Sequence, residues 1–359
     1  MTDSRSGSPA SSAVRRSVRG PVFVHALEEA YGKAAAAAGT RAFTLRIAGR
    51  VVRLVFAGSA LVAFARDALG SLEMSGGSAP DLTVNLWDTS STGVPPPSAP
   101  WTPDDLRPRG EIRGFSKGPV FASLSLSGGL AAFDETSVRG FFWARDANLL
   151  TIHERGAPLL SLFAWFFRAH GVNLVHAAAV GRGRDALLLA GPGGSGKSTT
   201  ALLCRAFGLE HFADDYALVS GAPRPAVHRL YGTAKLLPSS PAMPGEGDGA
   251  RLERAGSADG KTLFLLPPTP GGNDASGFAL RALVVPRVAG RGETSVSPLP
   301  PAEAFRALAP STVFQLPGAG AASLASLAAL VKSVPCFALS LGGDPAQAAS
   351  AVAGLLPPA

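Results

Sequence analysis

The sequence predicts an α/β protein built from two parts. A β-rich α+β domain is expected over residues 21–156, and a second domain with a mixed sheet flanked by helices is expected over residues 157–359. Three observations lead to this prediction. The first part contains short, near-alternating apolar runs, the second alternates strand-like with helix-like segments, and a glycine-rich loop there joins an apolar strand to a helix. With 359 residues, 46% of them hydrophobic, the chain has the length and composition of a two-domain globular protein.

The first elements follow from apolar spacing and from turn residues. Residues 1–20 are rich in serine and arginine and predict a flexible tail, because they contain no apolar core. A helix is expected over 22–39, and two strands around a glycine-containing turn are expected over 41–58. Another strand is expected over 81–88. The proline-rich stretch 92–105 that follows cannot form a helix or a central strand.

Three further short strands complete the predicted first domain, over residues 118–129, 138–146 and 148–155. Among them, "LSGGL" at 126–130 resembles the signature of transport ATPases. In those proteins the signature follows the phosphate loop, whereas here it precedes the glycine-rich loop. We therefore predict that this segment is a β-turn between two strands.

The second domain opens with an apolar helix over 157–171 and a strand pair that leads into the glycine-rich loop. A helix closed by Gly208 follows the loop. The later predicted elements are a strand over 278–288, helices over 301–310 and 321–334, a strand over 336–342 and a helix over 344–356. The connection 238–257 is rich in glycine, proline and serine, and it is predicted to be mobile.

Charge and composition exclude several kinds of protein. The net charge of +7 comes mostly from arginine spread along the chain, so nucleic acid is not the expected partner. Cys204 and Cys336 are too few for a disulfide framework or a cysteine metal site. No window approaches 18 uninterrupted apolar residues, so we expect no membrane partner and a cytoplasmic location.

The glycine-rich loop predicts a nucleotide site that uses ATP and Mg²⁺. Residues 191–198 fit the pattern G-x-x-x-x-G-K-[ST] between a strand and a helix. Such a loop points its N–H groups at phosphate oxygens, its lysine reaches the β and γ phosphates, and its serine binds Mg²⁺. The predicted nucleotide-binding residues are Gly191, Pro192, Gly193, Gly194, Ser195, Gly196, Lys197, Ser198 and Thr199.

Two aspartates and a histidine flank this loop. Asp214 and Asp215 begin 17 residues after Lys197, which places them at the end of a strand beside the loop. A kinase needs one carboxylate for Mg²⁺ and another to accept the proton of the acceptor hydroxyl, although an isolated aspartate pair is more often a solvated turn. His176 lies 15 residues before Gly191, in an apolar strand where a histidine is usually a core residue.

Together these residues resemble the catalytic domain of HPr kinase/phosphorylase and its relatives, which are bacterial serine kinases with a phosphate loop. The match is dense over residues 175–219 and diffuse over the rest of the second half, and it does not extend to the N-terminal domain. The resemblance implies a P-loop kinase domain over 157–359. It implies Asp214 as the base toward the acceptor serine, Asp215 with Ser198 at the metal, and His176 with Lys197 at the reacting phosphate. Because the HPr enzyme is a hexamer, the resemblance also implies a homo-oligomer.

The chain departs from that family in two places. Ala177 follows the histidine where the HPr enzyme has glycine, and no Asp or Glu occurs between Tyr216 and Pro244, where that enzyme has an acidic metal contact linked to phosphorylase activity. We therefore expect kinase rather than phosphorylase chemistry. Three cations follow instead, Arg229, Lys235 and Lys261, which either neutralise phosphate charge or are ordinary surface residues.

The function expected from the sequence is transfer of the γ-phosphate of ATP to a hydroxyl, with serine of an unidentified protein or peptide as the leading acceptor. The N-terminal domain is then the candidate for recognising the acceptor. A nucleotide-binding regulatory module without transfer and a kinase for a small metabolite remain alternatives. A mechanical P-loop ATPase is disfavoured, because the later strand runs into Pro286 and Arg287 instead of ending at an aspartate.

Overall fold

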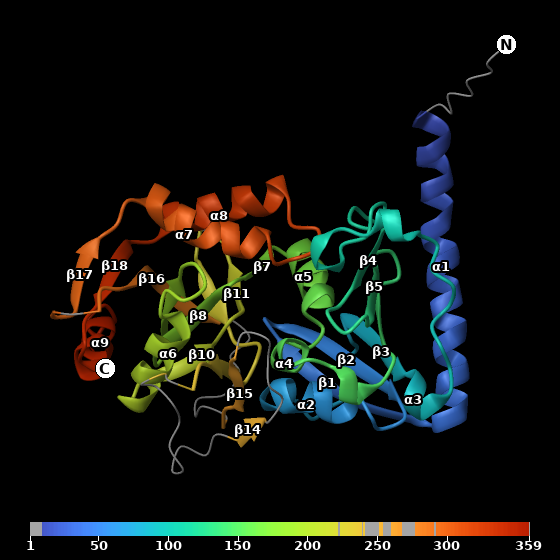
Figure 1. Ribbon diagram of the computed structural model, residues 1–359, viewed down its shortest axis with the longest axis horizontal. Coiled ribbons are helices and arrows are strands. Elements are labelled where there is room, and N and C mark those ends of the chain that lie inside the picture. The colour runs from blue at the N-terminus through green and yellow to red at the C-terminus, as the bar shows by residue number, and fades with distance from the viewer. Residues whose placement is uncertain are drawn as a thin grey trace.

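The computed structural model describes residues 9–221, 223–238, 240, 251–253, 260–267, 277–290 and 292–358. Within these ranges the chain is a mixed α/β protein whose strands form three sheets, of six, nine and three strands (Figure 1). The N-terminal and C-terminal sheets lie at opposite ends of the long axis, and the small sheet lies between them (Figure 1). The predicted mixed α/β character, with mixed sheets flanked by helices, is confirmed.

The six-stranded sheet is formed by the first part of the chain, in the order β1-β2-β3-β6-β5-β4. β3 pairs in parallel with β2 and β6, and the other neighbours are antiparallel. Its strands are β1 (Thr40–Ile47), β2 (Arg50–Ala57), β3 (Leu82–Asp88), β4 (Val120–Leu124), β5 (Leu130–Asp134) and β6 (Arg139–Ala144).

Helices cover both faces of this sheet because each face is apolar. Helix α1 (Pro9–Ala38) covers one face, where its Leu27 packs among Trp87 and Phe141. Helices α2 (Val62–Leu69) and α5 (Leu160–Ala169) cover the other face, where Phe64 stacks on Phe142 with ring centroids 5.3 Å apart. Helix α5 comes from the predicted second domain, yet its aromatic residues belong to the core of the first sheet. The two parts therefore share a core.

The nine-stranded sheet follows the order β10-β8-β9-β16-β12-β11-β7, with β18 paired to β16 and β17. β9, β16 and β18 run parallel, and β8 is antiparallel to β9 and β10. Its strands are β7 (Val172–Val175), β8 (Ala177–Arg182), β9 (Asp185–Ala190), β10 (Glu210–Ala213), β11 (Ala217–Ser220), β12 (Ala226–His228), β16 (Phe278–Val288), β17 (Ser295–Pro298) and β18 (Cys336–Leu341).

Two helices cover each face of this second sheet. Helices α7 (Pro301–Val313) and α8 (Ala321–Ser333) pack on one face, and α6 (Lys197–Ala206) and α9 (Pro345–Ala353) pack on the other (Figure 1). The small third sheet contains β13 (Thr233–Leu236), β15 (Thr262–Leu265) and β14 (Arg251–Glu253). Apolar residues of α6 pack against β13 and β15, which brings the third sheet to the helix that follows the glycine-rich loop.

Three predictions need comment. Residues 1–8 of the expected tail lie outside the described residues, and the prediction is wrong for 9–20, where α1 already runs with Pro9 in its first turn. The strand expected over 148–155 is also wrong. That segment forms a 3-10 turn, η4 (Ala147–Leu149), and helix α4 (Ile152–Gly156), whose capping box joins Thr151 and Glu154. Most of the predicted mobile connection lies outside the described residues, which include only 238, 240 and 251–253 from it.

The β-turn expected at "LSGGL" is confirmed. It joins the antiparallel strands β4 and β5, and the Ser125 N–H donates to the Gly129 carbonyl at 2.7 Å. The helix of 22–39, the strand pair of 41–58 and the strands and helices expected after residue 277 are also present.

Candidate functional site

The glycine-rich loop connects β9 to α6 and depends on backbone that only glycine adopts easily. Gly196 caps α6 with φ +97, and a Cβ there would stand 2.8 Å from Leu341 Cδ1. Gly191 and Gly194 also have positive φ angles. The loop therefore turns sharply into the first turn of α6, whose free N–H groups and partial positive charge form an anion site.

Lys197, the first residue of α6, is buried and held by the loop itself. Its Nζ donates to the carbonyl oxygens of Gly191 at 2.8 Å and Pro192 at 3.0 Å. Burial lowers the pKa of this ammonium, Asp215 and Asp214 oppose the shift, and Lys261 adds to it. Because its present acceptors are neutral carbonyls, charged phosphate oxygens would be stronger partners for Lys197.

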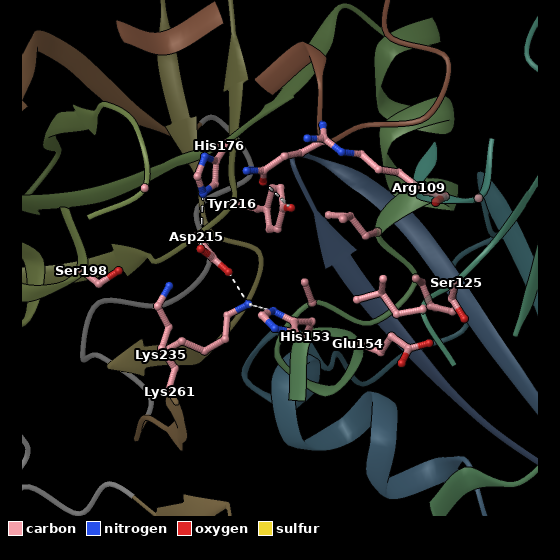
Figure 2. Close-up of a pocket in the computed structure, with 18 of the residues that line it drawn as sticks. Arg109, Ser125, His153, Glu154, His176, Ser198, Asp215, Tyr216, Lys235 and Lys261 are labelled. Carbon is pink, nitrogen blue, oxygen red and sulfur yellow. Dashed lines mark hydrogen bonds and ion pairs between the residues drawn. The ribbon is translucent and has the colours of Figure 1, made fainter. Parts of the chain in front are cut away.

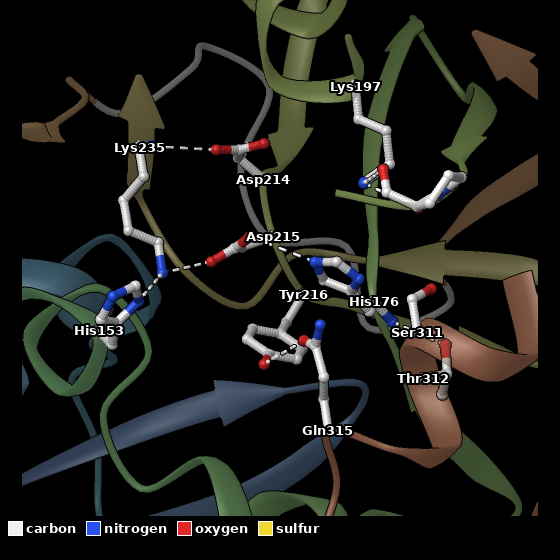
Figure 3. Close-up of polar contacts among 12 residues, drawn as sticks. His153, His176, Lys197, Asp214, Asp215, Tyr216, Lys235, Ser311, Thr312 and Gln315 are labelled. Atoms are coloured by element: carbon white, nitrogen blue, oxygen red, sulfur yellow. Dashed lines mark hydrogen bonds and ion pairs between the residues drawn. The ribbon is translucent and has the colours of Figure 1, made fainter. Parts of the chain in front are cut away.

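Asp214 and Asp215 follow β10, which pairs with β8, so one strand separates them from the strand of the loop. Asp215 has φ +64, a left-handed conformation that is costly for a residue with a side chain. The Tyr216 N–H donates to the Asp214 carbonyl at 2.7 Å in this tight turn. The turn sends the two carboxylates to different surroundings (Figure 3).

Asp214 lies beside Ser198. Its Oδ2 accepts the backbone N–H of Lys235 at 3.1 Å, and its buried Oδ1 has no hydrogen-bond partner among the described residues. Burial raises the pKa of Asp214 and so does the neighbouring Asp215, whereas Ser198 and Lys235 oppose the rise. A buried carboxylate oxygen without a hydrogen-bond partner is able to bind a further ligand.

Asp215 is held by two basic side chains (Figure 3). Its Oδ2 pairs with the Lys235 ammonium, and its Oδ1 lies 3.4 Å from Nε2 of His176. Burial by itself would raise the pKa of Asp215, but Lys235 and His176 outweigh this effect and hold the pKa well below its ordinary value. Asp215 is therefore a carboxylate that stays ionised.

His176 stands between helix α7 and the acidic pair, in the link between β7 and β8. Its backbone N–H donates to Thr312 Oγ1 of α7 at 3.0 Å, and its ring lies 5.6 Å from that of Tyr216. The Tyr216 hydroxyl donates to Gln315 Oε1 at 2.9 Å. Since the ring edge points at Asp215, this histidine belongs to the site and not only to the core.

Most of these groups line one cavity of about 900 Å³. His176, Ser198 and Asp215 lie on its wall (Figure 2). Lys197 and Thr199 line it as well. Gly193, Gly194 and Gly196 also line it, whereas Gly191, Pro192, Ser195 and Asp214 do not. The opposite wall comes from the first part of the chain and includes Arg109, Ser125, Phe142 and Glu154. The cavity therefore has the size of a ligand-binding pocket and is lined by residues of both parts of the chain.

The sequence left the roles of three cations undecided, and the structure places two of them on the cavity wall and the third away from it. Lys235 and Lys261 line the cavity, but Arg229 pairs with Glu210 at 2.7 Å and stacks over Phe212, away from it. Lys235 Nζ also lies 3.3 Å from Nδ1 of His153 on α4. Sequence reasoning did not identify His153 as a residue of the site, because no motif surrounds it.

No protein-family model matches the chain, and no curated protein is significantly similar to it. Across the described ranges, no helix combines the length and the apolar character needed to cross a bilayer. The same ranges contain no group of three or more His, Cys, Asp or Glu side chains placed to hold a metal ion. A metal here would need further ligands besides one such side chain, such as a hydroxyl or phosphate oxygens.

Proposed function

We propose that this protein is an ATP-dependent phosphotransferase that moves the γ-phosphate of ATP to a hydroxyl, with a serine of a protein or peptide as the leading acceptor. The observation that carries the proposal is that one cavity brings Lys197 and Ser198 of a phosphate loop to Asp215 and His176. The resemblance of the same residues to HPr kinase/phosphorylase supports it, and it supports a P-loop kinase domain in the second half of the chain.

The phosphate loop would hold the nucleotide. Its N–H groups and the N-terminus of α6 suit the phosphate oxygens, and Lys197 would exchange its loop carbonyls for the β and γ phosphates. The residues present fit Mg²⁺, because the unpartnered Oδ1 of Asp214 is a hard oxygen ligand beside the Ser198 hydroxyl. When bound, Mg²⁺ would neutralise charge on the transferred phosphate.

This assignment exchanges the roles that the resemblance implies for the two aspartates. Asp214 was expected to be the base, but it lies off the cavity wall and beside Ser198. Asp215 was expected at the metal, but it lies on the wall and is already paired with Lys235 and His176. We therefore place Asp214 at the metal and Asp215 at the acceptor.

Asp215 would orient the acceptor hydroxyl and accept its proton as the new P–O bond forms and the bond to ADP breaks. A weakly basic carboxylate suits this step, because a loose phosphoryl transition state needs little proton removal before bond formation. Lys235 and His176 keep Asp215 ionised and fix its direction. Lys261, on the same wall, adds positive charge where the phosphate is transferred.

The test uses purified protein, γ-labelled ATP, Mg²⁺ and either host extract or peptides encoded beside the gene. Label should appear on an acceptor and should be lost in Lys197→Ala and Asp215→Asn but not in the exposed control Lys332→Ala. Label found only in free phosphate would identify an ATPase instead. Tight ATP binding without turnover would identify a regulatory module and overturn the proposal.

A magnesium titration tests the exchange of roles. Asp214→Asn should raise the Mg²⁺ concentration needed for half-maximal turnover, whereas Asp215→Asn should lower kcat at an unchanged Mg²⁺ requirement. The opposite pattern would restore the roles that the family resemblance implies.

A small-metabolite kinase is the second candidate, because residues of both parts of the chain surround the acceptor end of the cavity. Label in a soluble compound would then replace label on a protein or peptide.

A further inference from the structure

A short hairpin of the N-terminal part forms the wall of the cavity that faces the proposed acceptor. Its two arms meet where Leu106 bridges Ile112, and Glu111 bridges Ser123 beside β4. The Arg107 N–H donates to the Glu111 carbonyl at 2.8 Å, and Glu111 Oε1 accepts the backbone N–H of Gly318 at 2.9 Å. The hairpin is therefore fixed both to the first sheet and to the segment after α7.

Arg109 stands at the tip of this hairpin, inside the 3-10 turn η3 (Pro108–Gly110), in a conformation that favours glycine. Its φ is +72, and Gly110 after it has φ +78. A Cβ on Gly110 would stand 1.7 Å from the Leu124 carbonyl oxygen, so Gly110 cannot carry a side chain. Arg109 has room for its side chain, but its positive φ strains the backbone in a way that glycine would avoid. Strained residues cluster at ligand sites, which makes Arg109 a candidate binding residue.

The Arg109 guanidinium points into the cavity from the side away from the phosphate loop. Figure 2 shows it extended toward Tyr216, with Asp215 and Tyr216 between it and Ser198. It makes no hydrogen bond or ion pair with any residue that the structure describes. The carboxylate of Glu154, which also lines the cavity, is already engaged by Ser127 Oγ at 2.6 Å and by Thr151. Arg109 therefore offers a cation without a partner on the acceptor side of the cavity.

The cavity that Arg109 enters combines apolar surface with hydroxyls. Phe64, Phe142, Leu126 and Leu160 line it together with Ser123 and Ser161. Leu126, which is 72% exposed, stands at the rim. An apolar wall beside a single guanidinium suits a ligand that has an apolar group and an anionic group, because the guanidinium fork pairs with carboxylate oxygens.

We propose that Arg109 and the apolar wall form an acceptor subsite that selects a hydroxyl compound carrying a carboxylate and an apolar group. The subsite rests on the proposed phosphotransfer, since it holds the acceptor while Asp215 faces its hydroxyl. The carboxylate belongs either to a small hydroxy acid or to a peptide, and both offer the same chemistry to Arg109. Lys235 is already paired with Asp215, whereas Arg109, which has no such partner among the described residues, is free to pair with the acceptor carboxylate.

Binding measured without turnover tests this subsite. The probes are acetylated leucyl-seryl-leucine as free acid and as C-terminal amide, and 3-phenyllactate as free acid and as methyl ester. Ligand-observed NMR titrations should give a Kd for at least one free acid about tenfold lower than for its neutral form. Preference within the peptide pair alone identifies a peptide acceptor, and preference within the phenyllactate pair alone identifies a small acid. Preference in both pairs shows that the carboxylate itself is recognised.

Variants of the same hairpin provide the controls. Arg109→Gln should remove the preference, whereas Arg107→Gln, an exposed arginine outside the cavity wall, should keep it. Arg109→Gly should also remove it without lowering the midpoint of unfolding, because glycine relieves the strain. Equal binding of acid and neutral forms, no binding of any probe, or a preference kept in Arg109→Gln would overturn the subsite. If the Arg109-dependent preference persists while no acceptor is ever labelled, the proposed function fails and the subsite stands.

Discussion

Replacing Lys235 with methionine tests the central ion pair of the site. Lys235 and Asp215 have side chains only 7% and 22% exposed, so the change leaves a carboxylate largely withdrawn from water. Removing one partner of a buried pair costs about 3–5 kcal/mol. Because His176 remains 3.4 Å from Asp215 and some water reaches the carboxylate, we expect the lower end, about 3 kcal/mol. The backbone N–H that Lys235 donates to Asp214 is unaffected, so the change reports on the side chain.

Urea unfolding is the measurement. With a slope of about 3 kcal/mol per M, the expected loss lowers the midpoint by about 1 M. The double variant Lys235→Met with Asp215→Asn removes both charges and should recover to within about 1 kcal/mol of the wild-type protein. Lys332→Met, at an exposed position, should stay within about 0.5 kcal/mol. A loss below about 1 kcal/mol for Lys235→Met, or a double variant that recovers nothing, would refute the view that the two charges depend on each other.

Three further predictions concern the same site. The pKa of Asp214 is raised in the folded protein. The favourable contribution of its protonated carboxyl to the free energy of unfolding is therefore complete below the unfolded pKa of about 4, and it is lost as the pH rises through the folded pKa. Asp214→Asn should therefore raise the free energy of unfolding at pH 7 without Mg²⁺ and not at about pH 3; an equal effect at both pH values would contradict this. Lys197→Ala should weaken ATP binding about 10- to 100-fold in a fluorescent-nucleotide titration, because phosphate loses a charged donor, and unchanged affinity would place the nucleotide elsewhere. Thr312→Val leaves the buried His176 N–H without its acceptor and should cost about 1–3 kcal/mol in unfolding, whereas the neighbouring Ser311→Ala should cost less than about 0.5 kcal/mol.

Much of the fold could be predicted because its signals are local. The strand pair of 41–58 and the helices after residue 300 follow from apolar spacing, and the structure contains them. The strand expected over 148–155 failed because its apolar run is short, and the capping box of Thr151 and Glu154 outweighs it. The membership of α5 in the first core could not be predicted, since it depends on aromatic contacts with a sheet formed far earlier in the chain.

The sequence by itself determined the glycine-rich loop between a strand and a helix, because its glycines, lysine and serine lie within eight residues of one another, and the proposed phosphate site follows from their order. It also determined that an acidic pair and a histidine come near the loop, since one helix and one return strand span the interval. Only the tertiary structure decided that Asp215 faces the cavity while Asp214 lies beside Ser198, because a single left-handed residue sets their directions. It also decided that Lys235 and Arg109 complete the cavity. Lys235 comes from the third sheet and Arg109 from the turn η3 beside the first sheet, so their approach depends on how these parts of the chain pack.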